Sequence, residues 1–209
     1  MIQVQPNTKM MYRVVKRTAD IVLSLLGLAV LFPLLLVIAA AVAAEKEGGV
    51  IFRQERAGWK NKPFTIYKFR TMVKNAAALR ADMERYNEQD GPAFKMKHDP
   101  RVTKVGRFLR RTSLDELPQL FNVLKGDMSL VGPRPLPTYE SEKCTGEQLQ
   151  RLLVKPGITC SWQICGRNEV PFSEWMKMDL QYINEQSIRT DLKILLYTVQ
   201  AVLSERGAY

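Results

Sequence analysis

The sequence predicts an α+β protein, mainly helical, in which a proline-broken re-entrant membrane helix precedes a small β-hairpin and several amphipathic helices. Three observations lead to this prediction. Residues 21–44 contain no charged side chain and have Pro33 near their centre. Two short segments rich in β-branched and aromatic residues follow, with turn residues between them. The rest of the chain repeats apolar side chains at helical spacing.

The apolar run at residues 21–44 is long enough to cross a bilayer, because helical residues that rise ~1.5 Å each cover a ~30 Å hydrocarbon core in about 20 residues. Basic residues flank the run on both sides, and the positive-inside tendency draws both flanks toward the cytoplasm. A helix broken at Pro33 can enter the membrane and leave it by the same face, which places both basic flanks on the cytoplasmic side. A single span that the proline only kinks remains the alternative.

We expect three parts along the chain: a disordered leader at residues 1–11, the re-entrant membrane helix at 12–48, and a cytoplasmic domain with interfacial C-terminal helices at 49–209. The net charge of +10 suits an anionic partner, which could be membrane lipid, a nucleotide phosphate or nucleic acid. The apolar run favours membrane lipid. Since the chain shows no zinc-ligand spacing or recognition-helix pattern, we expect no nucleic acid partner.

The segment after the membrane helix indicates a β-hairpin, because residues 50–52 and 64–69 are β-rich and residues 57–61 supply turn residues. Residues 73–87 are expected to form a charged helix that ends before Gly91 and Pro92. A short helix is expected at 117–125, where apolar side chains recur at i, i+3, i+4 and i+7 before a glycine.

Two amphipathic helices are expected in the C-terminal third. The first covers about residues 173–185, and the second presents apolar side chains from Leu192 to Leu203. These helices either pack on the core or lie in the membrane interface. Trp162 and Trp175, with lysines nearby, favour a membrane-surface position for part of this region.

The cysteines and the histidine restrict the chemistry. Three cysteines without a CxxC spacing make a disulfide framework improbable and indicate a reducing compartment. His98 is the only histidine, which excludes any multi-histidine metal site and leaves Ser-His-Asp chemistry possible only if His98 itself serves as the base. Acid, base and metal-ligand roles must therefore fall to carboxylates.

Asp115 and Glu116 are adjacent carboxylates, and the basic Arg110 and Arg111 precede them. One interpretation is structural, since Ser113-x-x-Glu116 matches a capping box at a helix start. The other is chemical: one carboxylate attacks phosphorus, the other binds Mg²⁺, and the arginines neutralise phosphate oxygens. Both interpretations are open at this point.

Arg134 lies between Pro133 and Pro135 in a loop rich in turn residues. The two prolines restrict the backbone and leave the guanidinium little freedom to lose on binding a phosphate. Lys68 and Arg70 alternate with aromatic residues on the second predicted strand, so that one face can reach a ligand. For all three basic residues, a solvated surface position is the alternative.

Three longer motifs resemble those of a known family. They are Lys68-Phe69-Arg70-Thr71-Met72, the run DPRVTKVGRFLRRTSLDELPQL at 99–120, and Ser129-Leu130-Val131-Gly132-Pro133-Arg134-Pro135. In this order they are similar to the bacterial sugar transferases, also called monotopic phosphoglycosyl transferases or polyprenyl-phosphate hexose-1-phosphate transferases. The resemblance covers about residues 12–203 and suggests the small type, which is the catalytic module alone.

The resemblance implies an enzyme on the cytoplasmic face of the bacterial inner membrane, acting in the synthesis of exopolysaccharide or lipopolysaccharide. It would move a hexose-1-phosphate from a UDP-sugar to undecaprenyl phosphate and release UMP by a ping-pong mechanism. By the same resemblance Asp115 is the nucleophile that forms a covalent phosphosugar. Glu116, together with Asp115, would hold Mg²⁺, and the membrane helix would break at Pro33.

The basic residues near this pair are expected to bind the substrate phosphates, because a carboxylate that attacks a diphosphate needs positive charge around it. These residues are Arg110, Arg111, Arg134, Lys68 and Arg70. Pro133 and Pro135 are expected to position the loop.

Two departures and one rival accompany the resemblance. The family commonly has glycine where Cys160 stands, which questions the local backbone geometry, and Cys165 is also unusual. The rival is a non-catalytic basic scaffold at the membrane surface, in which Asp115 and Glu116 only cap a helix. The sequence does not choose the sugar, and it leaves the oligomeric state open, including a homodimer.

Overall fold

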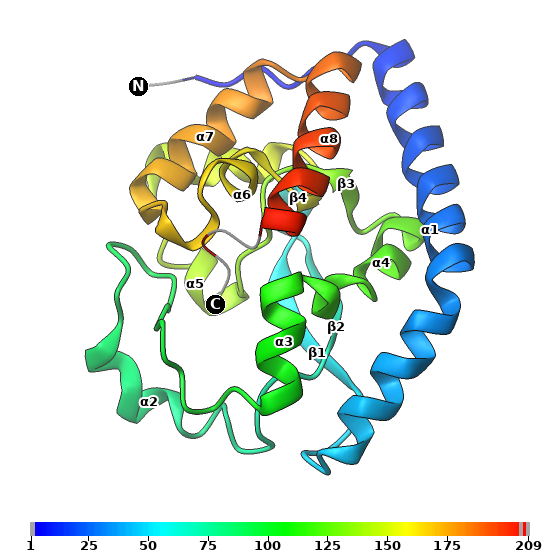
Figure 1. Ribbon diagram of the computed structural model, residues 1–209. Helices are drawn as coiled ribbons and strands as arrows, with labels where there is room; N and C mark the ends of the chain where they lie inside the picture. Colours follow the sequence, from blue (N-terminus) through cyan, green and yellow to red (C-terminus); the bar gives the residue numbers. More distant parts are fainter. Residues whose placement is uncertain (1–2, 205–206, 208–209) are drawn as a thin grey trace.

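The computed structural model describes residues 3–204 and Gly207. A long helix, α1 (Met10–Ala44), runs along one side of the molecule, and the other elements gather against it (Figure 1). The chain is mainly helical with two small two-stranded sheets, one antiparallel and one parallel. The predicted α+β class is therefore confirmed.

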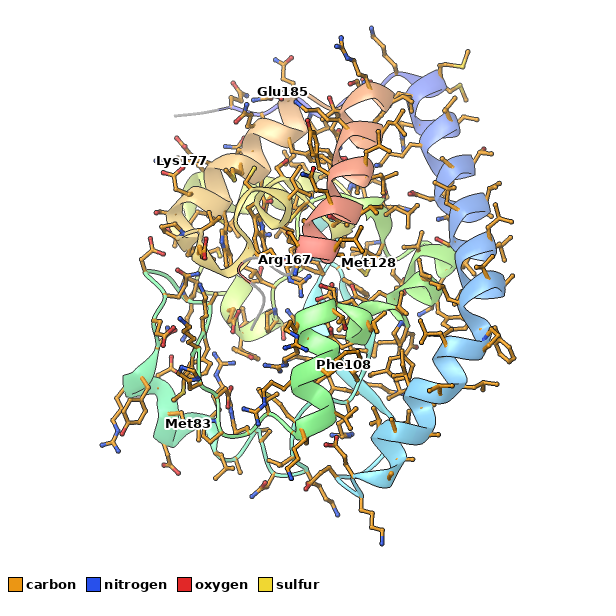
Figure 2. The ribbon with its side chains drawn as sticks, viewed as in Figure 1. Met83, Phe108, Met128, Arg167, Lys177 and Glu185 are labelled. Carbon is orange, nitrogen blue, oxygen red and sulfur yellow. The ribbon has the colours of Figure 1, made fainter. Side chains whose placement is uncertain are left out.

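The predicted break at Pro33 is absent, because helix α1 stays helical through this residue; the helix bends instead, about midway along its length (Figure 1). A proline inside a helix removes one i→i−4 hydrogen bond and its ring clashes with the preceding turn, which accounts for the bend. The helix is long and apolar enough to cross a membrane by length and composition, and only 11% of its most apolar window is buried. Figure 2 shows its outward side chains as almost entirely carbon along most of the helix.

The predicted hairpin is confirmed. Strands β1 (Ile51–Ala57) and β2 (Pro63–Phe69) pair antiparallel with Arg53 opposite Tyr67, and a 3₁₀ turn at Trp59–Asn61 connects them.

The helix predicted at residues 73–87 is wrong in extent. Only α2 (Arg80–Met83) and a following 3₁₀ turn (Glu84–Tyr86) are helical, and residues 74–79 form turns. The buried Arg101 explains the difference, because its Nη1 donates to the carbonyl of Ala76 at 3.2 Å and its own carbonyl accepts from Val73 N at 2.9 Å. These tertiary hydrogen bonds outweigh the weak local helix preference.

The middle of the chain forms a series of short elements. They are α3 (Lys104–Thr112), the 3₁₀ turn η3 (Leu114–Glu116), α4 (Gln119–Lys125), β3 (Ser129–Val131), α5 (Thr138–Ser141), η4 (Gly146–Leu153) and β4 (Gly157–Thr159). β3 and β4 form the parallel pair. The helix predicted at 117–125 is confirmed as α4, which ends at Gly126 with a φ of 93°. That left-handed conformation is one that glycine adopts without strain.

The C-terminal region contains α6 (Ser161–Cys165), a 3₁₀ turn (Arg167–Glu169), α7 (Phe172–Asn184) and α8 (Ile188–Ser204). Helix α7 packs in the core. Trp162 and Trp175 are buried there and stack at 4.2 Å between ring centroids, so the predicted membrane-surface position of these tryptophans is wrong. Their large apolar rings are stabilised more by burial against each other than by a surface position.

Helix α8 divides its apolar residues between two faces. Ile194 is buried, while an outer row remains exposed and consists of Leu192, Leu196, Val199 and Leu203. This row supports the interfacial alternative for α8.

The predicted leader is only partly as expected. Residues 3–9 form neither helix nor strand, yet they lie against the protein: Val4 is buried, and its backbone N donates to Gln150 Oε1 at 2.8 Å. Residues 1 and 2 lie outside the described residues. All three cysteines are free thiols.

Candidate active site

A cleft of about 1060 Å³ opens between the hairpin, the α3–η3 corner, the loop after β3 and the C-terminal end of α8. Among the residues that the structure describes, eleven lysines and arginines line the cleft against four carboxylates. Because a concave surface of one sign concentrates its electrostatic field, this cleft suits a multiply charged anion.

Asp115 and Glu116 lie on η3 and both line the cleft. Helix α3 ends at Thr112. The next residue, Ser113, adopts a left-handed φ of 58°, and its side chain makes no capping hydrogen bond to η3. The capping-box interpretation of this segment is therefore wrong. The chain turns sharply at Ser113, and the turn presents the two carboxylates to the cleft.

Glu116 is held by two cations. Lys68 Nζ lies 3.0 Å from Glu116 Oε1, and Arg134 Nη1 lies 3.0 Å from Oε2 while Nη2 contacts Oε1. Burial alone would raise the pKa of Glu116, but the charges of Arg134 and Lys68 outweigh it and hold this pKa well below its usual range. Glu116 is therefore ionised at neutral pH.

Asp115 has a different environment. Its side chain is only 7% exposed, and the described residues give it no hydrogen bond or ion pair. Burial raises the pKa of Asp115 to about 6, and the nearby negative charge of Glu116 acts in the same direction. A carboxylate with two free oxygens that opens on a basic cleft is chemically available, whereas its neighbour is fixed in place.

The loop that presents Arg134 is fixed by its backbone carbonyls. Arg151 Nη2 donates to the carbonyl of Arg134 at 2.5 Å, and Arg56 Nη1 donates to that of Pro135 at 2.9 Å. Arg151 is itself buried in an ion pair with Asp179, with Nη2–Oδ2 at 2.7 Å. The predicted stiff loop is present and anchored at two points.

At Gly157 the start of β4 lies very close to the loop that carries Arg134, and this close approach lets the backbone of β4 bind the loop. Gly157 N donates to the carbonyl of Pro133 at 3.0 Å, and a Cβ on Gly157 would lie 2.1 Å from Gly132 N. Any other residue at this position would push the loop away from β4.

The remaining predicted basic residues divide between the cleft and the outer surface. Arg110 lines the cleft and its Nε donates to Thr71 Oγ1 at 3.0 Å. Burial lowers the pKa of Arg110, which faces the charge of Asp115. Arg70 also lines the cleft, but its Nε donates to the carbonyl of Gly49 at 2.7 Å. Arg111 is exposed on α3 and is not among the residues that line the cleft.

Sequence reasoning missed Arg56, Arg151 and Asp179 as supports of the site. No local signal marks them, because each meets its partner across a long stretch of chain. Arg56 and Pro135, for example, are 79 positions apart.

Cys160 has a φ of −153°, which is extended backbone that any residue adopts. The glycine that the family commonly has here is thus not required by the backbone, and the doubt about Cys160 is removed. Its thiol donates to Gln163 Oε1 at 3.1 Å. Cys165 ends α6 and is exposed.

The corner that holds the carboxylates rests on α1. Leu120 Cδ1 would lie 3.4 Å from a Cβ on Gly27, and Leu117 belongs to the same apolar cluster as Leu35 and Ile38. Contacts from this corner therefore reach α1 on both sides of Pro33.

Asp115 and Glu116 match part of the ligand set that a magnesium ion usually has in proteins. Mg²⁺ is usually bound by one or two carboxylates together with substrate phosphates and water, and not by a full protein cage. Asp115 and Glu116 are the two carboxylates. Asp115 has no competing partner among the described residues, whereas both oxygens of Glu116 are paired with Lys68 and Arg134. Within that part of the chain, no group of three or more His, Cys, Asp or Glu residues forms a metal cage.

Comparisons with known proteins identify the family of this chain. The sequence profile described as "Bacterial sugar transferase" matches residues 11–205. The chain is 46% identical over 96% of its length to "Galactosyl transferase CpsE" of Streptococcus agalactiae, covering 44% of that protein. It is 42% identical over its full length to "Undecaprenyl-phosphate galactose phosphotransferase" of Salmonella typhimurium, covering 45% of that protein.

A shorter relative is matched almost end to end. "Exopolysaccharide production protein ExoY" of Rhizobium meliloti is 38% identical over 93% of this chain and 88% of that protein. The chain spans less than half the length of CpsE and the Salmonella protein. The family profile nevertheless matches residues 11–205, nearly all of this chain, and the chain belongs to the bacterial sugar transferase family.

Proposed function

We propose that this protein is a phosphoglycosyl transferase that moves a hexose-1-phosphate from a UDP-sugar to undecaprenyl phosphate. The products are an undecaprenyl-diphospho-sugar and UMP, and the reaction starts a polysaccharide on the cytoplasmic face of the bacterial inner membrane. The main support is the contrast between two adjacent carboxylates in one basic cleft. Glu116 is fixed by Lys68 and Arg134, whereas Asp115 has no such partner among the residues that the structure describes.

In the first half-reaction a carboxylate oxygen of Asp115 attacks the β-phosphorus of the UDP-sugar. A bond forms between this oxygen and phosphorus, and the bond from the β-phosphorus to the bridging oxygen breaks. UMP leaves with that oxygen and its electron pair, and the sugar phosphate stays on Asp115 as an acyl phosphate.

In the second half-reaction a phosphate oxygen of undecaprenyl phosphate attacks the same phosphorus. The Asp115 carboxylate is the leaving group and returns to its starting state. One cleft thus serves a water-soluble donor and a lipid acceptor in turn.

The basic residues compensate the charge that accumulates in both steps. Lys68 and Arg134 hold Glu116 and line the cleft, and the partly buried Arg110 adds a positive charge near Asp115. When bound by Asp115, Glu116 and donor phosphates, Mg²⁺ would neutralise phosphate oxygens and favour departure of UMP.

We further propose that α1 is re-entrant, with both ends on the cytoplasmic side. Its bend, its exposed apolar surface and the basic residues on both flanks support this arrangement. A membrane helix that returns to the same face would hold the cleft at the height of the lipid headgroups.

A screen of UDP-sugars with undecaprenyl phosphate and Mg²⁺ tests this proposal, with UMP release as the readout. Release of UMP that depends on one donor and on the lipid acceptor is expected. No UMP release from UDP-glucose, UDP-galactose or their N-acetylated counterparts would reject the proposed reaction.

A further inference from the structure

The first part of α1, before the uncharged run at residues 21–44, has a polar face that contacts the rest of the protein. Tyr12, Lys16 and Asp20 follow one another at intervals of four residues, so they lie on one side of the helix. Tyr12 and Asp20 are buried, and the Lys16 side chain is only 16% exposed. This part of α1 lies beside β3 and α8 (Figure 1), and the polar face binds both.

The Lys16 ammonium connects α1 to three other elements. Its Nζ donates to the carbonyl of Val131 on β3 at 3.0 Å, to Asp191 Oδ2 on α8 at 2.9 Å and to the hydroxyl of Tyr182 on α7 at 3.4 Å. An ammonium has three N–H donors, so these contacts use all of them.

Tyr182 also approaches the Val131 carbonyl, but its hydroxyl has a single proton. The hydroxyl oxygen lies 2.7 Å from Asp191 Oδ1 and 3.2 Å from the carbonyl oxygen of Val131. The shorter contact takes the proton. Lys16 is therefore the stronger side-chain donor to Val131.

Asp20 binds the other end of β3. Its Oδ1 accepts from Ser129 Oγ at 3.0 Å and from Leu130 N at 2.9 Å. Strand β3 has only three residues, Ser129–Val131, and contacts with α1 reach each of them. Because a two-stranded sheet of this length is marginal by itself, the side chains of α1 supply part of what fixes β3.

The chain leaves β3 directly into the loop that carries Arg134. Only Gly132 and Pro133 separate Arg134 from Val131, whose carbonyl Lys16 binds. The proline fixes one backbone dihedral of this short connection. A displacement of the Val131 carbonyl therefore moves the start of the loop, and Arg134 moves with it.

We propose that Lys16 is a positioning residue, whose hydrogen bond to the Val131 carbonyl sets the position of Arg134 relative to Glu116. The inference rests on the proposed function and gives α1 a part in the reaction besides membrane anchoring. The corner that carries Glu116 rests on the same helix, since Leu120 Cδ1 would lie 3.4 Å from a Cβ on Gly27. Helix α1 thus supports both members of the Arg134–Glu116 ion pair.

The test starts from Lys16→Met, which removes the ammonium and keeps a long side chain. Asp191 keeps the hydroxyls of Tyr12 and Tyr182 as donors, at 3.0 and 2.7 Å, so no buried carboxylate is left unpaired and the variant should fold. Arg13→Met is the matched control, because it removes the same charge from an exposed position on the same part of α1. Lys16→Arg restores a charged donor.

The kinetic readout uses the full chain in nanodiscs with undecaprenyl phosphate and the UDP-sugar that the protein turns over. For Lys16→Met we expect kcat to fall by about tenfold or more and KM for the UDP-sugar to stay within about threefold, because Arg134 acts on charge that develops in the transition state. Lys16→Arg should recover kcat to within about threefold, and Arg13→Met should stay within about twofold of the unmodified protein.

A double variant separates positioning from a general loss of stability. In an Arg134→Lys background, Lys16→Met should lower kcat by less than about threefold further, because both substitutions then act on one contact. A residue that only stabilises the fold would lower kcat by the same factor in both backgrounds.

Hydrogen exchange makes the outcome independent of turnover. The amide of Gly132, which follows the carbonyl that Lys16 binds, donates to the carbonyl of Thr159 at 3.0 Å. We expect Lys16→Met to speed exchange in peptides that cover residues 129–136 and to leave the hairpin at residues 51–69 unchanged, whereas Arg13→Met should change neither. If this result is obtained while the unmodified protein turns over no UDP-sugar, the proposed reaction fails and the positioning of Arg134 by Lys16 stands.

Three results would reject the role of Lys16 and leave the reaction intact. They are an unchanged kcat in Lys16→Met, an equal fall in kcat in the two backgrounds, and unchanged exchange at residues 129–136. If the melting temperature shows that Lys16→Met does not fold, Lys16→Gln is measured by the same criteria. Its shorter, neutral amide cannot replace the three contacts of the ammonium, so the same pattern is expected with a smaller fall in kcat.

Discussion

Arg134 forms a bidentate ion pair with Glu116: Nη1 lies 3.0 Å from Oε2, and Nη2 contacts Oε1. The fork of the guanidinium matches the two oxygens of the carboxylate, and this geometry fixes both side chains at once. Asp115, the next residue along the chain, has no such partner among the described residues. This asymmetry supports the proposed roles, in which Asp115 reacts and the neighbouring Glu116 is held in a fixed position.

Replacing the unpaired carboxylate should stop the reaction without unfolding the protein. We expect Asp115→Asn to lower the rate of UMP release by at least about a thousandfold, because a neutral amide cannot form the acyl phosphate. The variant should still sediment with membranes. Asp82→Asn, an exposed change on α2, is the matched control, and near-normal turnover in Asp115→Asn would contradict its role as nucleophile.

The same substitution should stabilise the protein above pH 6. Asp115 has its pKa raised to about 6 by burial, so between about pH 4 and 6 the folded state binds more protons than the unfolded state. Folding stability from this group is therefore present at low pH and is lost as pH rises through 6. Relative to the unmodified protein, Asp115→Asn should gain up to about 3 kcal/mol at pH 7.5 and little at pH 4. Thermal melts across this range measure the difference, and an equal shift at both pH values would disprove this prediction.

Activity should fall in acid for the same reason. In the proposed reaction the attacking group is the ionised carboxylate of Asp115, so kcat/KM for the UDP-sugar should decrease as pH falls through about 6. A profile of kcat/KM from pH 5 to 8 tests this. A kcat/KM that stays constant down to pH 5 would contradict a pKa of about 6 for Asp115.

Lysine should be a poor replacement for Arg134. A single ammonium cannot contact both oxygens of Glu116, and losing one charged hydrogen bond costs about 1.5–3 kcal/mol. We expect Arg134→Lys to lower the unfolding free energy by an amount in this range and to reduce kcat by about tenfold or more. Arg107→Lys, on the exposed side of α3, should change neither. Full activity in Arg134→Lys would show that two-point contact is unnecessary.

The buried ion pair between Arg151 and Asp179, which supports the Arg134 loop, should contribute to the stability of the protein. Asp179 is 1% exposed and pairs with Arg151, so Asp179→Asn leaves a buried guanidinium without its counter-charge, which costs about 3–5 kcal/mol. Denaturant unfolding measures this loss, with Glu174→Gln on the exposed side of α7 as the control. A loss below 1 kcal/mol would show that Arg151 finds another partner.

The hairpin and helices α4, α7 and α8 could be predicted because apolar periodicity and glycine punctuation are local signals. The helix at residues 73–87 could not, since Arg101 binds the carbonyl of Ala76 from a distant part of the chain. Asp115 and Arg134 could be named as candidate site residues because each lies in a local sequence motif. Nothing in the sequence points to Arg151, whose role depends on three segments meeting in space.

The topology of α1 can be measured directly. In a variant whose three cysteines are replaced by serine, single cysteines at Lys9 and Gly49 report the two ends of the helix, and both positions are exposed. A re-entrant helix predicts that a membrane-impermeant thiol reagent labels both from the same side of sealed vesicles. Labelling from opposite sides would establish a single span.

The most direct test of the central claim is to trap the phosphosugar on the protein. Purified protein is mixed with Mg²⁺ and a UDP-sugar labelled in the sugar, without acceptor lipid, and the denatured protein is digested and mapped by mass spectrometry. The account predicts one sugar phosphate per chain, attached to the peptide that contains Asp115, with one UMP released and the adduct lost on adding undecaprenyl phosphate. UMP release that occurs only when the lipid is present, with no labelled peptide at any time, would contradict it.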